Sequence, residues 1–122
     1  MTPDEFINDS IERGALDGLV NLDKDRTWIF LVSEAEVYCD MEGIDSFIDK
    51  YGTDGVLQCA EAFRIIGASE IADGLSLICS SLMDVPEVLL SDVNSLITER
   101  AGYDYEAIRR VAKDVLTRSG GL

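Results

Sequence analysis

The sequence contains no histidine, which removes the commonest general base and the commonest metal ligand. Ser-His-Asp and Cys-His nucleophile pairs are therefore excluded, as are the zinc and di-iron motifs that need histidine. The glycine-rich phosphate-binding patterns GxxxxGK[ST] and GxGxxG do not occur either. Two neighbouring carboxyl groups could still act as acid and base, but acids on helices are usually solvated. We therefore predict a protein that is not an enzyme and holds no metal or other cofactor.

Cysteines are few and long apolar runs are missing. Cys39, Cys59 and Cys79 do not have the spacing of a zinc site, and three cysteines cannot all pair. Each lies among apolar residues of helical spacing, so we expect buried free thiols. The longest apolar run, residues 28–32, is too short to span a membrane, and the acidic N-terminus does not resemble a signal peptide. We expect a cytoplasmic protein that does not bind membranes.

Basic residues are also scarce: the chain has ten basic and 24 acidic residues, which gives a net charge of −14. Such a chain repels nucleic-acid phosphates and attracts basic proteins. Residues 1–63 carry a net charge of −11 and residues 64–122 only −3, which suggests one strongly acidic surface. Four bases near the C-terminus, from Arg109 to Arg118, are too few for nucleic-acid binding. The partner that we expect is a basic protein, although the acidity could also serve only solubility.

Apolar residues recur at helical spacing along the whole chain, and no segment alternates with the period of a strand. The first helix should begin at Thr2-Pro3, and Gly14 allows it to break. A segment that is apolar nearly all round its axis starts at Trp28, which predicts a central helix with Trp28 in the core. Further helices are expected at about 26–41, 43–51, 55–66, 69–82, 86–100 and 104–118. We predict an all-α, compact single domain over residues 1–118, with six or seven short helices and a flexible tail at 119–122.

The segment from Glu34 to Gly52 combines a core-facing stripe with a row of acids. Its apolar residues Ile44, Phe47, Ile48 and Tyr51 fall at i, i+3, i+4 and i+7. Acids one turn apart lie on the other side of the same helix. The predicted partner-binding residues are Asp40, Glu42, Asp45, Asp49 and Asp54.

Several short motifs resemble a family of small bacterial all-helical domains. The residues that carry the resemblance are Glu36-Val37, Gly43-Ile44, Phe47, Gly52, Ala72 and the segment AEAFRIIGA at 60–68. The match spans about residues 28–80, and Met41-Glu42-Gly43-Ile44 stands where the family has Asn-Gly-Gly-Phe. The family includes a DNA-mimic protein that binds a transcriptional repressor. The resemblance therefore implies a helical fold and a DNA-mimic mode of binding.

These observations favour an acidic module that binds a basic nucleic-acid-binding protein and presents carboxylates to it where DNA would present phosphates. An immunity or antitoxin-type protein that neutralises a basic toxin, such as a nuclease, is the alternative. A self-associating protein without a basic target, for example a homodimer, is a further expectation that the sequence leaves open.

Overall fold

The computed structural model describes residues 1–81 and 84–119 of the chain. Over these ranges the protein is all-helical and has no strand, which confirms the predicted fold class. The helices are α1 (Pro3–Asp17), the short 3-10 helix η1 (Leu19–Asn21), α2 (Lys24–Met41), α3 (Ile44–Ile65), α4 (Ser69–Ser80), α5 (Glu87–Thr98) and α6 (Tyr105–Arg118). No helix within these ranges is long and apolar enough to cross a membrane.

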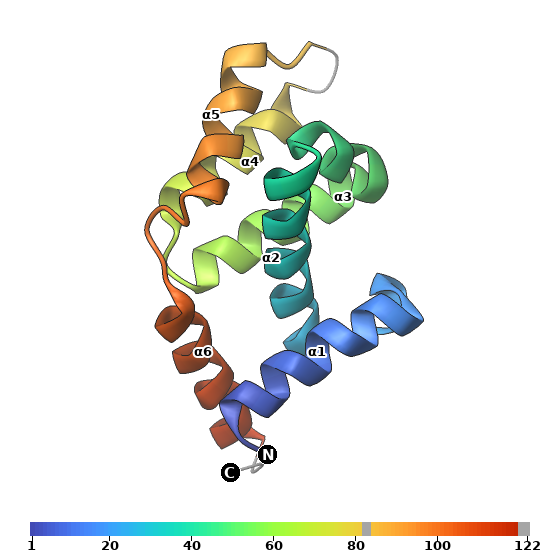
Figure 1. Ribbon diagram of the computed structural model, residues 1–122, viewed down its shortest axis with the longest axis vertical. Coiled ribbons are helices and arrows are strands. Elements are labelled where there is room, and N and C mark those ends of the chain that lie inside the picture. The colour runs from blue at the N-terminus through green and yellow to red at the C-terminus, as the bar shows by residue number, and fades with distance from the viewer. Residues whose placement is uncertain (82–83, 120–122) are drawn as a thin grey trace.

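Helix α2 runs along the long axis of the molecule and connects its two ends (Figure 1). It packs against α1 near its beginning and against α3 and α5 further along. Helices α3, α4 and α5 gather at one end, whereas α6 lies against α1 at the other end, where both termini lie (Figure 1). The first and last helices of the sequence are therefore neighbours in space.

Three helices begin at side chains that cap them, and two of these starts, at Thr2 and Asp104, were predicted, whereas α2 begins at Lys24, before the predicted residue 26. Thr2 and Glu5 form a reciprocal capping box, with the Glu5 amide donating to Thr2 Oγ1 over 3.1 Å. The Asp23 carboxylate accepts from the Arg26 amide, and the Asp104 carboxylate from the Ala107 amide, both over 2.9 Å. Each cap satisfies a backbone amide that has no partner within its own helix.

Two predicted boundaries are wrong. Helix α1 does not break at Gly14 but continues to Asp17 and ends at Gly18, whose φ is +84°. Gly14 is buried against the ring of Phe30, so its missing side chain allows α1 to approach α2 closely. Helix α5 ends at Thr98, earlier than predicted, because Arg100 takes a left-handed conformation with a φ of +55°.

Gly52 bends the chain where the sequence predicted one helix to end. Its φ of +69° and ψ of −178° are not helical, so α3 consists of two helical segments joined at a kink. Glycine adopts this conformation without a steric penalty. Asp54, one of the predicted partner-binding residues, follows this kink, is exposed and makes no side-chain hydrogen bond within the described ranges.

The predicted core is largely confirmed. Trp28 is 6% exposed, and Ile44 and Phe47 are buried, while Ile48 and Tyr51 pack against the core with part of their surface exposed. The three cysteines are buried free thiols, as expected. Residue 82, where the sequence predicted a helix to end, and residues 120–122 of the predicted tail lie outside the described residues.

Candidate protein-binding surface

The fold separates the charges of the chain along its long axis. Residues 30–100, which include most of α2 and all of α3, α4 and α5, hold 14 acids and three bases, a net charge of −11. The other residues, which include α1 and α6, hold ten acids and seven bases, a net charge of −3. Because α1 and α6 meet at one end, the strongly acidic part of the molecule is the other end (Figure 1).

The first segment of α3 displays its acids to solvent. Asp45 and Asp49 are exposed on α3, and Glu42 is exposed just before it. None of these three carboxylates forms an ion pair in the part of the chain that the structure describes. On the opposite side of the segment, Ile44 and Phe47 are buried. The helix therefore has the two faces that the spacing of its residues predicted.

Helix α5 adds an acid that sequence reasoning missed. Asp45 of α3 and Glu87 of α5 line the same shallow hollow of about 290 Å³. The two helices are joined there by Asn94, whose Oδ1 accepts a hydrogen bond from the Ile44 amide over 2.9 Å. No local sequence signal links Glu87 to Asp45, because the two residues come together only when α5 packs beside the start of α3.

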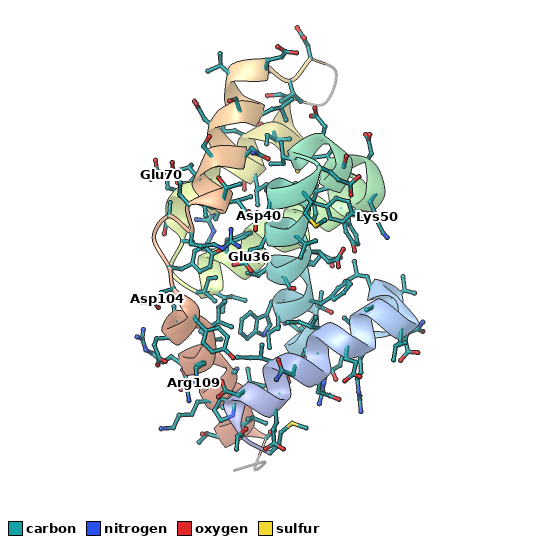
Figure 2. All side chains as sticks on the ribbon, viewed as in Figure 1. Glu36, Asp40, Lys50, Glu70, Asp104 and Arg109 are labelled. Carbon is teal, nitrogen blue, oxygen red and sulfur yellow. The ribbon has the colours of Figure 1, made fainter. Side chains whose placement is uncertain are left out.

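Asp40 differs from the other predicted binding residues because an arginine holds its carboxylate. Arg100 donates to both Asp40 oxygens, over 3.0 and 3.3 Å, and its Nε lies 3.1 Å from Glu36 Oε2. The hydrogen bonds from Arg100 keep the pKa of Asp40 below its usual value. Glu36 also accepts a hydrogen bond from the Tyr103 hydroxyl over 2.6 Å. Asp40 and Glu36 thus fix the connection between α5 and α6 to α2 (Figure 2), and Asp40 is not a free surface charge.

Asp54 lies beyond the kink of α3. It is exposed and forms no ion pair within residues 1–81 and 84–119. Because Gly52 interrupts the helix, Asp54 does not continue the helical register of Asp45 and Asp49. The structure therefore keeps Glu42, Asp45 and Asp49 as neighbours in one segment, adds Glu87 and separates Asp54 from the row.

The small basic group on α6 is partly used inside the protein. Arg109 donates to Asp4 of α1 and to Glu106, each over 2.9 Å. The ion pair between Arg109 of α6 and Asp4 of α1 also helps to hold the first and last helices together.

Two other hollows open on the surface. One, of about 480 Å³, lies between the end of α1, the middle of α2 and the start of α3. The other, of about 900 Å³, lies between η1, α6 and parts of α2 and α3, and Trp28, Ile65 and Val115 are among its mostly apolar lining residues. Among the described residues, no three potential ligands gather in an arrangement that would hold a metal ion.

Comparisons with known proteins add no relative. No family model matches the chain, and neither the curated proteins nor the solved structures contain a significant match. The resemblance to the DNA-mimic family stays a prediction from short motifs, and the function must be argued from the surface itself.

Proposed function

We propose that this protein is a non-enzymatic binding module that engages a basic nucleic-acid-binding protein through its acidic end, in the manner of a DNA mimic. The observation that carries the proposal is the exposed group formed by Glu42, Asp45, Asp49 and Glu87, which we call the acidic face. These carboxylates have no ion pair within the described ranges, although the rest of the chain pairs several of its acids.

The geometry of charge supports this mode of binding. Acids one turn apart on a helix lie about 5–6 Å from each other, whereas duplex DNA carries roughly one charge per 1.7 Å of its axis. One helix is therefore a sparse imitation of DNA, and a second element must contribute. Helix α5 does so, because Glu87 and Asp45 line the same hollow. Concentrated charge at one end of the molecule would also speed the approach of a basic partner.

The proposal is tested by capturing a partner on the immobilised protein from a lysate of the source organism. At low salt we expect a basic nucleic-acid-binding protein to be retained, and to be released both by high salt and by competing duplex DNA. The double variant Asp45→Lys with Asp49→Lys should lose most of this capture, because it reverses two charges of the acidic face.

A control variant reverses two charges at the other end. Glu12 of α1 and Asp114 of α6 are exposed and form no ion pair in the described part of the chain. Glu12→Lys with Asp114→Lys makes the same change in net charge and should retain the partner. Equal loss in both double variants would mean that only net charge matters, and capture that DNA cannot displace would contradict a DNA mimic. A captured nuclease that loses its activity on binding would instead favour the immunity-type alternative.

A further inference from the structure

A half-buried carboxylate without a cation faces the hollow of about 480 Å³. This carboxylate belongs to Glu34 of α2, and its Oε2 accepts a hydrogen bond from the Tyr51 hydroxyl over 2.8 Å. No lysine or arginine within the described ranges forms an ion pair with Glu34, in contrast to Glu36 one half-turn away. A carboxylate that is partly removed from water carries a desolvation cost, which a bound cation would offset.

Aromatic rings form walls around the same hollow. Tyr38 and Tyr51 both line it, with ring centroids 6.5 Å apart and ring planes at 84° to each other. Phe30 lines it as well. The face of an aromatic ring attracts a cation, and aromatic side chains that line a pocket are a recurrent way of holding organic cations. The hollow therefore combines negative charge with the ring surfaces that suit a guanidinium or an ammonium group.

The hollow already has one cation at its edge. Lys50 lines it, and its Nζ lies 5.9 Å from the centroid of the Tyr51 ring. Lys50 is exposed at the side of the molecule (Figure 2) and its stem is flexible, so a ligand can displace its ammonium group. Glu42, a member of the acidic face, lines the hollow too. The hollow is therefore continuous with the surface through which a basic protein would bind.

We propose that this hollow binds the charged end of one arginine or lysine side chain of the basic partner. This inference rests on the proposed function and adds a specific anchor to it. Glu34 and Glu42 would supply the negative charge, while Tyr38 and Tyr51 would surround the ligand group. The acidic face attracts the partner over a distance, and the hollow fixes one of its side chains in place.

The test is an NMR titration of the protein with N-acetyl-arginine amide, with N-acetyl-citrulline amide as the uncharged probe of nearly the same shape. We expect the arginine probe to shift the amide signals of Gly14, Gly18 and Tyr51, with a dissociation constant on the order of 1 mM. The citrulline probe should leave these signals unchanged. Equal shifts with both probes, or shifts that avoid these residues, would overturn the inference.

Three single variants sharpen the assignment. Glu34→Gln keeps an acceptor for the Tyr51 hydroxyl but removes the charge, and should weaken binding of the arginine probe about tenfold. Lys50→Gln removes the competing cation and should strengthen binding about threefold. Glu70→Gln removes one exposed acid from α4, on the side of the molecule opposite Lys50 (Figure 2), and should change nothing. Unchanged affinity in Glu34→Gln would overturn the assignment, and Glu42→Gln gives the same test on an exposed residue if Glu34→Gln does not fold.

The two proposals fail in different ways. If the protein captures a basic partner but the arginine probe does not bind the hollow, the anchor is wrong and the acidic face still stands. If the probe binds the hollow but no basic protein is captured, the proposed function fails and the anchor loses its source of ligand.

Discussion

Replacing Gly14 by alanine separates what local sequence preference predicts from what tertiary packing requires. Gly14 lies inside α1, where alanine is favoured over glycine by about 1 kcal/mol in helix propensity. Propensity alone therefore predicts that Gly14→Ala stabilises the protein. In the structure, however, the added Cβ would overlap the ring of Phe30, which is 4% exposed.

The packing cost exceeds the helical gain. Forcing an extra carbon into a well-packed site costs about 1–3 kcal/mol. The overlap includes Cγ of Phe30, which rotation of the side chain moves little, so the cost should lie in the upper part of this range, at about 2–3 kcal/mol. After subtraction of the propensity gain of about 1 kcal/mol, we expect Gly14→Ala to lower the free energy of unfolding by about 1–2 kcal/mol. For a domain of this size the midpoint of thermal unfolding should fall by roughly 3–10 °C.

The assay is urea and thermal unfolding followed by circular dichroism, with a double-mutant cycle as its control. Phe30→Leu removes the ring that Gly14→Ala meets, so the two substitutions together should cost about 1–2 kcal/mol less than the sum of the single variants. Ala15→Gly at the neighbouring exposed position should lose about 1 kcal/mol, which checks the helical term by itself. A Gly14→Ala protein more stable than the wild type, or single variants that add without coupling, would refute the close contact between α1 and α2.

Two further predictions concern the ion pairs of Arg100 and the thiols. Arg100→Met should lower the free energy of unfolding only slightly, because Arg100 and Asp40 are 36% and 43% exposed and water screens the pair. Because the pKa of Asp40 is lowered in the folded state, the ion pair stabilises the protein above the ordinary pKa of 3.8, and this stabilisation is lost as the pH falls through the lowered pKa. The difference in the free energy of unfolding between wild type and variant should therefore shrink in acid. A difference that stays constant in urea titrations across this pH range would contradict the pairing. Burial raises the pKa of Cys39 to about 12 and that of Cys59 well above its usual value. Both thiols should therefore react with DTNB much more slowly in the native protein than in urea. Fast reaction of either thiol in the native protein would show that this thiol is accessible.

Local chemistry determined the helices and many of their ends. Thr2 and Asp104 cap helices because their side-chain oxygens reach free backbone amides nearby in the chain. The apolar stripe that contains Ile44 and Phe47 fixes which face of its segment is buried, since the period of the pattern matches the helix. These features depend on residues within a few positions of each other, so the sequence alone predicts them.

The acidic face and the cation-binding hollow depend on contacts that the sequence does not encode locally. The net charges of the two halves of the sequence suggested that the N-terminal half forms the acidic surface. In the structure, however, α1 packs against α6, and most of the negative charge lies at the other end of the molecule, which is built from the middle of the chain. In the sequence Asp40 and Asp45 were both predicted to bind a partner, but in the structure Arg100, 60 positions away, donates a hydrogen bond to the Asp40 carboxylate. Glu87 joined the acidic face only through the packing of α5.

The sequence by itself thus determined that this is an acidic helical protein and, for most of its helices, which side faces the core, because hydrophobic periodicity and capping act within a single helix. Only the tertiary structure decided which carboxylates are paired and which remain exposed, and which aromatic residues line the same hollow as Glu34. Ion pairing and burial depend on distances between helices, and those distances are set by the packing of the whole core.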